Sequence, residues 1–296
     1  MLLKGNRGFF SSLVISTVAF LELILLWRIL RSENHKYEES SCEGVERRLF
    51  ARSGGLSELA GPLDITRWHA WNNFGACKNL KFFGGRLWRK ADKHQDYMDG
   101  HKAVCLDEQI RPVPGNCLVY SFGVNDNWSF EDAMLKYGCE VHGFDPTIGE
   151  PKQTGERQFI FHKIGLQGKD EINTKGWQMK SFRSIMKLLG HEKRIIDVVK
   201  MDIEQSEYEA IPNMIETGVM GQIKQIALET HNYGMVRSWR ETYIIRYQQI
   251  WKLEKHGFVR FSSQAGMGTD KLNEIANISD HFIFEMAWYN PKFYFA

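Results

Sequence analysis

Downstream of residue 117, apolar segments of strand length alternate with segments whose apolar residues recur at helical spacing. This alternation is typical of α/β domains, in which parallel strands are joined by right-handed helical crossovers. We therefore predict an α/β fold built on a mainly parallel sheet. The predicted strands cover residues 118–122, 140–144, 159–164, 195–201, 225–231, 258–262 and 281–286, and the predicted helices cover 129–137, 181–189, a short segment after 206, and about 237–256.

Two serines mark expected helix starts. Ser129 is followed three residues later by Asp132, and Ser206 by Glu209, which is the spacing of a capping box. The second of these helices is expected to break near Pro212, because proline cannot donate a backbone hydrogen bond.

A long apolar stretch lies close to the N-terminus. Phe9–Leu26 holds 18 residues with a single charge at Glu22, and the apolar character continues to Leu30. A helix needs roughly 20 apolar residues to cross a bilayer, so we predict a transmembrane signal anchor. The alternative is a cleaved signal peptide and a secreted protein, but the run exceeds the usual h-region and no small-residue cleavage site follows at once. The predicted parts are a cytosolic tail (1–8), the anchor (9–30), a polar stem (31–66) and a folded domain (67–296).

The charge of the predicted body argues against a nucleic-acid partner. The full chain has a formal net charge of +2, and once residues 1–31 are set aside it holds 34 basic and 35 acidic residues. Nucleic-acid-binding proteins normally carry an excess of Lys and Arg. We therefore expect no nucleic-acid partner, and expect contact with a membrane through the N-terminal helix.

The five cysteines favour an oxidising compartment. They show no zinc-site spacing, whereas disulfides fit a body in the secretory lumen. Cys117 and Cys139 each lie six residues before the residue that ends their strand, so neighbouring parallel strands would place them side by side. Cys77 would then pair with Cys105, which leaves Cys42 in the stem for a disulfide-linked dimer.

Orientation in the membrane follows from these cysteines. Lys and Arg counts on the two sides of the apolar stretch are similar, so they do not decide it. The disulfides and two glycosylation sequons, at Asn127 and Asn277, favour a type II protein with its body in the secretory pathway, in the Golgi lumen. Asn277 is expected to carry a glycan. Asn127 is not, because it lies just ahead of a helix start.

Polar residues follow the predicted strands, where ligands bind in doubly wound sheets. Asp145 lies 22 residues after Gly123, the spacing at which an acid holds the ribose diol of a nucleotide. The first loop has one glycine where a pyrophosphate-binding fingerprint has three. The pattern therefore suits a nucleoside ligand without phosphates, of which S-adenosylmethionine is the obvious candidate. The alternative is a tight turn and a solvated aspartate.

Three segments resemble a known family. CLVYSFGVNDNWSFE, GCEVHGFDPT and KMDIEQSEYEAI resemble the methyltransferase-like protein 24 group, a branch of the S-adenosylmethionine-dependent methyltransferases related to the FkbM type. The resemblance implies a Rossmann-like, seven-strand, mostly parallel methyltransferase sheet with helices on both faces. It places Gly123 and its neighbours at the methionine end of the cofactor and Asp145 at its ribose. The cofactor-binding residues we expect are Ser121, Phe122, Gly123, Asn125, Asp126, Asp145, Pro146 and Asp202.

Acids and an imidazole end two strands that should be neighbours. Asp202, Glu204, Glu229 and His231 would converge there. Such a group can bind a divalent cation, for which Asp202 and Glu229 are the candidate ligands, or supply a general base that activates an acceptor oxygen. The candidate catalytic residues are Asp202, Glu204 and His231. The alternative is structural, with Lys200 paired to the acids and His231 serving the fold alone.

Three functions remain open from the sequence. The first is a membrane-anchored methyltransferase that acts on a small molecule, a glycan or a protein side chain. The second is a binding protein that keeps the methyltransferase fold without turnover, which the glycine-poor first loop favours. The third is a type II Golgi glycosyltransferase, suggested by the anchor and by the DxE-like Asp202-Ile-Glu204.

Overall fold

The computed structural model of the chain describes residues 62–73, 75–90, 95–149, 159–231, 239–266 and 283–294. All of them belong to the unit Gly61–Ala296. The predicted anchor, the stem up to residue 61, Cys42 and the sequon at Asn277 lie outside the described residues. Within the described ranges, no helix is long and apolar enough to cross a membrane.

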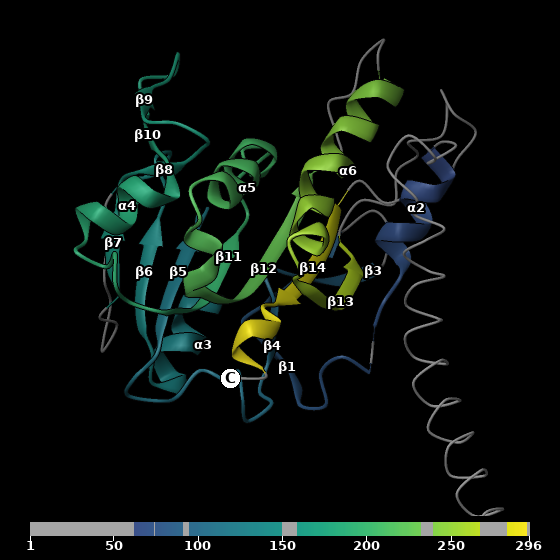
Figure 1. Cartoon of the computed structure of the whole chain (residues 1–296), viewed down its shortest axis with the longest axis horizontal. Coiled ribbons are helices and arrows are strands. Elements are labelled where there is room, and N and C mark those ends of the chain that lie inside the picture. The colour runs from purple at the N-terminus through teal and green to yellow at the C-terminus, as the bar shows by residue number, and fades with distance from the viewer. Residues whose placement is uncertain are drawn as a thin grey trace, which may run out of the picture. The chain divides into compact units, whose positions relative to one another are not determined.

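A seven-strand sheet forms the centre of this unit (Figure 1). Its strands are β5 (Leu118–Phe122), β6 (Glu140–Phe144), β7 (Ile160–His162), β11 (Ile196–Met201), β12 (Ile223–His231), β13 (Val259–Ala265) and β14 (Ile283–Tyr289). Their order across the sheet is β13-β14-β12-β11-β5-β6-β7. The strands from β7 to β12 are parallel, and β14 is antiparallel to both of its neighbours. The predicted mostly parallel seven-strand sheet is confirmed.

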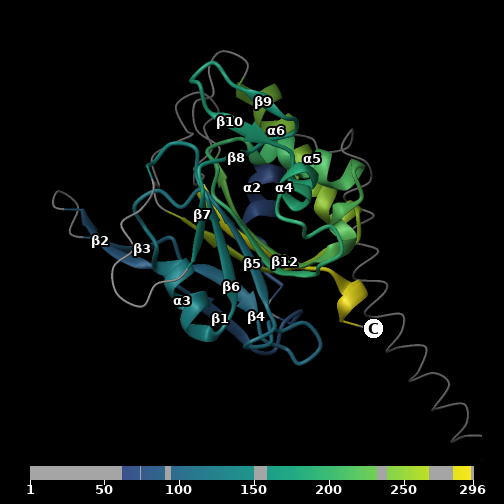
Figure 2. The same cartoon turned by 90° about the vertical axis from the view of Figure 1, so that its left-hand side faces the viewer.

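Helices cover both faces of the sheet, as Figure 2 shows for α3 and α4. The helices are α2 (Pro62–Ala70), α3 (Ser129–Tyr137), α4 (Phe182–Leu188), α5 (Glu207–Glu216) and α6 (Trp239–Lys255), with 3-10 turns at Val219–Gln222 and Pro291–Phe293. On one face, Phe130 of α3 packs in a cluster with Val119 and Val198. On the other face, α4, α5 and α6 pack over Val199, Tyr120 and Phe122, which alternate along their strands with the residues that face α3.

Four strands at the N-terminal end of this unit form two small sheets, which we call the N-terminal strand layer. The layer consists of β1 (Leu80–Phe83) paired with β4 (Lys102–Cys105), and β2 (Arg86–Lys90) paired with β3 (Gln95–Asp99), all antiparallel. Of these, β1 and β4 pack on the α3 face of the central sheet. Strand β4 contacts β12 and β14. The side-chain amide of Gln225 forms two hydrogen bonds with the backbone of Cys105. It accepts from the N–H at 2.8 Å and donates to the carbonyl oxygen at 2.9 Å.

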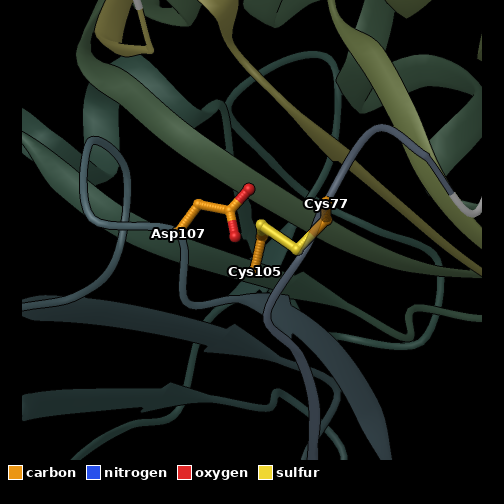
Figure 3. A group of neighbouring side chains, drawn as sticks. All are labelled: Cys77, Cys105 and Asp107. Atoms are coloured by element: carbon orange, nitrogen blue, oxygen red, sulfur yellow. A yellow bond between two sulfur atoms is a disulfide. The ribbon is translucent and has the colours of Figure 1, made fainter.

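Both predicted disulfides are present. Cys117 and Cys139 precede neighbouring parallel strands, and their Cα atoms lie 4.7 Å apart. Cys77 is bonded to Cys105 with Cα atoms 5.9 Å apart, and Figure 3 shows this bond beside the carboxylate of Asp107. Cys117 and Cys139 lie at the same distance before the ends of their strands. Because β5 and β6 pair in parallel, the two cysteines lie side by side, as predicted.

The start of α3 differs from the prediction. Trp128, and not Ser129, is the N-cap residue, and it makes no side-chain cap hydrogen bond. The hydroxyl of Ser129 accepts from the N–H of Gly85 at 2.8 Å and donates to Asn127 at 2.7 Å. The serine therefore ties the helix to the turn between β1 and β2, so the predicted capping box was wrong.

Helix α5 also differs, because it continues through Pro212 to Glu216. Only one backbone donor is missing there, and burial of Ile211 and Met214 holds the helix against the sheet. Ser206 is its N-cap residue but makes no side-chain cap hydrogen bond. A small sheet of β8 (Gly165–Leu166), β9 (Glu171–Ile172) and β10 (Gln178–Lys180) was not predicted from the sequence.

Candidate functional site

Gly123 follows β5 at a position that only glycine can occupy. Its φ is +74°, and a Cβ atom on it would lie 1.6 Å from the carbonyl oxygen of Asp202. Its N–H donates to the carbonyl of Phe144 at the end of β6 (2.9 Å), and the N–H of Asp202 donates to the carbonyl of Phe122 (3.1 Å). The loop after β5 is therefore held between the ends of β6 and β11, and the absence of a side chain at Gly123 allows this close approach of the Asp202 carbonyl.

Asp145 directly follows β6 and is 3% exposed. One carboxylate oxygen accepts from the N–H (2.7 Å) and the hydroxyl (2.6 Å) of Thr147, and the other accepts from the N–H of Asn125 (2.9 Å). A carboxylate has about four acceptor positions. Asp145 therefore retains one acceptor position, which is what a ribose hydroxyl requires.

The side chains of Ser121 and Phe122 lie inside the domain. Phe122 is buried and stacks on Phe144, with ring centroids 4.5 Å apart. Ser121 is buried on the opposite face and donates a hydrogen bond to Glu131 of α3. Of these two residues, only the backbone is placed to meet a ligand at the end of β5.

Lys200 does not form the ion pair with the acids after β11 that the structural alternative required. Its ammonium donates to the carbonyl oxygen of Gly123 at 2.7 Å and lies 3.7 Å from Glu131. The lysine therefore supports the first loop, and the carboxylate of Asp202 meets other partners.

The remaining predicted cofactor residues lie on loops. Asn125 is exposed and has a φ of +49°, and its backbone serves Asp145. Asp126 is exposed and forms a long surface contact of 3.9 Å with Arg86. Pro146 is half-buried. The first loop thus offers mainly backbone groups to a ligand.

Asp202, Glu229 and His231 meet at the ends of β11 and β12, which are adjacent and parallel. Nε2 of His231 lies 3.3 Å from Oε1 of Glu229 and 3.6 Å from Oδ1 of Asp202. One ligand atom from each of the three side chains lies within 4.8 Å of the other two. The structure thus brings together three of the four polar residues that end these strands.

Glu204 lies at the margin of this group. Its side chain is 68% exposed, compared with 25% for Asp202, and its nearest oxygen is 4.0 Å from Nε2 of His231. Glu204 and Gln205 both have positive φ values, 52° and 84°. Two successive non-glycine residues in this region indicate a strained turn, which favours a functional role for the segment.

Lys102 of β4 completes the group and was not predicted. It is 1% exposed, and its ammonium nitrogen lies 3.0 Å from Glu229, 2.5 Å from Glu285 and 4.0 Å from Asp202. We call Lys102, Asp202, Glu229, His231 and Glu285 the acid–base cluster. The N-terminal strand layer therefore contributes a charge to the candidate site.

Burial and charge set the protonation of the cluster. Burial and the adjacent Glu229 raise the pKa of Asp202 to about 6, against the opposing effect of Lys102. Burial also raises the pKa of Glu285 well above its usual range. Burial opposes ionisation of Glu229 too, but the charges of Lys102 and His231 hold its pKa well below its usual range. The carboxyls therefore differ in proton affinity although they lie close together.

His231 is held as a cation. Burial alone would lower its pKa, but hydrogen bonds and charge interactions with Glu207 and Glu229 raise the pKa to about 11. The backbone N–H of His231 also donates to Glu207 at 3.3 Å. An imidazolium ion has no lone pair with which to accept a proton or bind a metal. The electrostatics therefore favour Asp202 as the proton acceptor of the site.

Sequence reasoning missed Lys102, Glu131 and Glu285. Glu285 interrupts the apolar strand IFEMAWY, Lys102 begins the buried strand KAVC, and Glu131 lies beside the apolar face of α3. A charge buried in such a segment needs a partner. The sequence therefore carried a signal for buried ion pairs, although it could not say which residues pair.

Comparisons with known proteins match the chain to a domain family and to two curated relatives. The model of a family described as a methyltransferase domain matches residues 82–279. The protein named probable methyltransferase-like protein 24 from Homo sapiens is 29% identical over 209 residues, which cover 64% of this chain and 56% of that protein. Its namesake from Rattus norvegicus is 29% identical over 208 residues with the same coverage. This chain thus spans 56% of the length of these curated relatives.

Solved structures give weaker likenesses. A Streptococcus mutans protein assigned as an S-adenosylmethionine-dependent methyltransferase has 11% identity and a TM-score of 0.34, covering 70% of this chain and 56% of that chain. The plantazolicin methyltransferase BpumL in complex with S-adenosylhomocysteine has 10% identity and a TM-score of 0.29, covering 59% of this chain and 76% of that chain.

Proposed function

The chain belongs to this family of methyltransferase domains, and on that premise we propose that it uses S-adenosylmethionine to methylate an oxygen atom of a small molecule, glycan or protein side chain. When bound, the cofactor supplies a methyl group on a positively charged sulfur. The acceptor oxygen bonds to the methyl carbon as the carbon–sulfur bond breaks, and that electron pair stays on the sulfur of S-adenosylhomocysteine. The acceptor proton passes to the carboxylate of Asp202.

One observation carries the cofactor assignment. Asp145 is held by backbone and side-chain donors in a fixed orientation, with one acceptor position remaining. Gly123 lies close by, and its missing side chain leaves room for the carbonyl oxygen of Asp202, which fixes the loop after β5. A ribose hydroxyl can donate to the carboxylate while the rest of the nucleoside lies along the loop after β5. We assign Asp145 to the ribose and the backbone from Ser121 to Asp126 to the remainder of the cofactor.

The role of base falls to Asp202. A pKa of about 6 leaves it mostly ionised at neutral pH, yet close enough to accept a proton efficiently. Its side chain is partly exposed, so an acceptor can reach it. In this proposal His231 acts as a fixed positive charge that orients Asp202 and Glu229. The exposed Glu204 contacts the acceptor.

A divalent cation fits the acid–base cluster poorly. The cluster already contains two positive charges, the ammonium of Lys102 and the imidazolium of His231. A cation bound by Asp202 and Glu229 would have to displace the first from its carboxylates and take the proton from the second. We therefore propose methyl transfer without a metal ion at this position.

We also propose that the domain lies in the secretory lumen, anchored by residues 9–30, or secreted if that segment is cleaved. The two disulfides support an oxidising compartment. A free Cys42 in the stem would allow a disulfide-linked dimer. Expression in a eukaryotic cell tests the topology: glycosidase should shift the wild-type chain but not the Asn277→Gln variant. An equal shift of both would contradict glycosylation at that residue.

The catalytically inactive binding protein remains the second candidate. The observation that favours it is Asp145, which already uses three of its acceptor positions. The glycosyltransferase alternative loses support, since the family match is to a methyltransferase domain and the carboxylates of its DxE-like segment differ widely in exposure.

Calorimetry on the purified full chain separates these functions. S-adenosylmethionine and a nucleotide sugar with Mn²⁺ are titrated separately. We expect saturable binding of S-adenosylmethionine and of S-adenosylhomocysteine, and none of the nucleotide sugar. Binding of the nucleotide sugar alone would contradict the proposal. Binding of neither would support a binding protein for another ligand.

A further inference from the structure

A second group of ligating side chains lies on the α4 face of the sheet, at the amino end of β6. Glu140 is the first residue of that strand, His142 lies two residues later on the same face, and His191 follows α4. Oε1 of Glu140 lies 2.9 Å from Nε2 of His142 and 3.9 Å from Nε2 of His191. The three ligand atoms lie within 4.8 Å of one another. We call these residues the Glu140 cluster.

The second ring nitrogen of each histidine is already held. Nδ1 of His142 lies 3.0 Å from Nε2 of His162, and Nδ1 of His191 lies 2.7 Å from the hydroxyl of the buried Tyr120. Histidines that bind metals usually have their other nitrogen fixed in this way, because the partner sets the tautomer and the ring orientation. Both imidazoles are buried. Packing in the core therefore holds their Nε2 atoms facing the carboxylate of Glu140.

From this geometry we propose that Glu140, His142 and His191 form a zinc site. In a tetrahedral site with bonds of about 2.0–2.1 Å, ligand atoms lie about 3.3 Å apart, so small side-chain shifts would bring the observed distances into range. Two imidazoles and one carboxylate are ligands that zinc accepts, whereas magnesium and calcium prefer oxygen ligands. Water fills the fourth position.

Arg194 contacts two of the three proposed zinc ligands. Its guanidinium donates to both oxygens of Glu140 at 2.8 Å each, and to Nε2 of His191 at 3.2 Å. Because Arg can only donate, Nε2 of His191 must carry a lone pair directed into the cluster. The side chain of Arg194 is 40% exposed, so it can move into solvent when zinc binds. Zinc and Arg194 therefore compete for the same carboxylate.

Binding requires both His142 and His162 to change tautomer. Nε2 of His142 must lose its hydrogen to bind zinc, and Nδ1 then carries the proton and donates to Nε2 of His162, whose own proton moves to its Nδ1. The contact at 3.0 Å between these nitrogens allows either direction of donation. The bound metal would join β6 to the end of α4, at the sheet edge opposite the acid–base cluster. The metal would lie away from the acid–base cluster and would therefore take no part in methyl transfer.

The test is calorimetric titration of Zn²⁺ into the purified full chain, made without a histidine tag and stripped with a chelator. We expect one equivalent to bind, and Co²⁺ to give the visible absorption of a tetrahedral site. His191→Asn should abolish this equivalent, and Glu140→Gln is the second ligand variant should the first fail to fold. His256→Asn, at an exposed histidine after α6, is the matched control and should bind as wild type does.

Two further variants distinguish a zinc site from a purely structural network. Tyr120→Phe should weaken binding about 10- to 100-fold, because the orientation of His191 is lost. Arg194→Gln should strengthen binding roughly 2- to 5-fold, because a competing exposed ion pair is removed. The proposal is overturned if the wild-type chain binds no zinc, if His191→Asn and Glu140→Gln still bind one equivalent, or if Arg194→Gln weakens binding.

Discussion

The ammonium nitrogen of Lys102 lies 3.0 Å from a carboxylate oxygen of Glu229, although the two residues are 127 positions apart in the sequence. Lys102 belongs to the N-terminal strand layer, and Glu229 to the last parallel strand of the central sheet. Both side chains are buried. The ion pair therefore makes the N-terminal layer part of the candidate site, and its loss would leave the buried Glu229 with one cationic partner fewer.

Replacing Lys102 should destabilise the fold strongly. Lys102→Met is expected to lower the free energy of unfolding by about 3–5 kcal/mol, because the buried carboxyls of Glu229 and Glu285 both lose the ammonium that they share. Chemical denaturation measures the change. Lys136→Met, at an exposed position on α3, is the control and should stay within about 0.5 kcal/mol of wild type. Equal losses in the two variants would contradict the proposed importance of the pair.

The bond between Cys117 and Cys139 should contribute about 3 kcal/mol, given its sequence separation of 22 residues. Replacing both cysteines with serine should lower the free energy of unfolding by that amount. Cys42→Ser should leave unfolding unchanged and remove any disulfide-linked dimer on a non-reducing gel. Peptide mapping without reduction should recover both intrachain pairs, and a free thiol at Cys117 would show that this account is wrong.

The charge of His231 predicts a dependence of stability on pH. Its pKa of about 11 in the fold lies above the value near 6.5 of an unfolded chain. Its stabilising contribution is therefore complete below about pH 6.5 and declines as the pH rises towards 11. The difference in unfolding free energy between wild type and His231→Gln should shrink between pH 7 and 10. A constant difference over that range would mean that His231 is neutral in the fold.

Much of the fold could be predicted because its signals are local. Strands such as Leu118–Phe122 and Ile196–Met201 are short apolar runs, and their alternation with helices fixes a mainly parallel sheet. Parallel pairing then converts equal sequence offsets into proximity, which is why Cys117 and Cys139 could be paired. The same reasoning brought Asp202 and Glu229 to one edge.

The rest depends on packing between distant segments. Lys102 joins the acids because its strand packs across β12 and β14, a placement that periodicity does not encode. The protonation of His231 depends on Glu207, which α5 brings beneath it. Ser129 was predicted to cap its helix because of local spacing, but a tertiary contact with Gly85 engages its hydroxyl. The hydrogen-bond and ion-pair partners of these side chains, and with them the pKa of His231, are therefore set by the tertiary structure.

Binding of S-adenosylmethionine to a short series of variants tests the central claim most directly. Asp145→Ala should raise the calorimetric dissociation constant roughly 10- to 150-fold, equivalent to about 1.5–3 kcal/mol for the loss of a charged acceptor. Thr147→Val removes one support of Asp145 and keeps the carboxylate and the backbone donor, so it should bind within about threefold of wild type. A folded Asp145→Ala variant with an unchanged dissociation constant would contradict the assignment of this site to the cofactor.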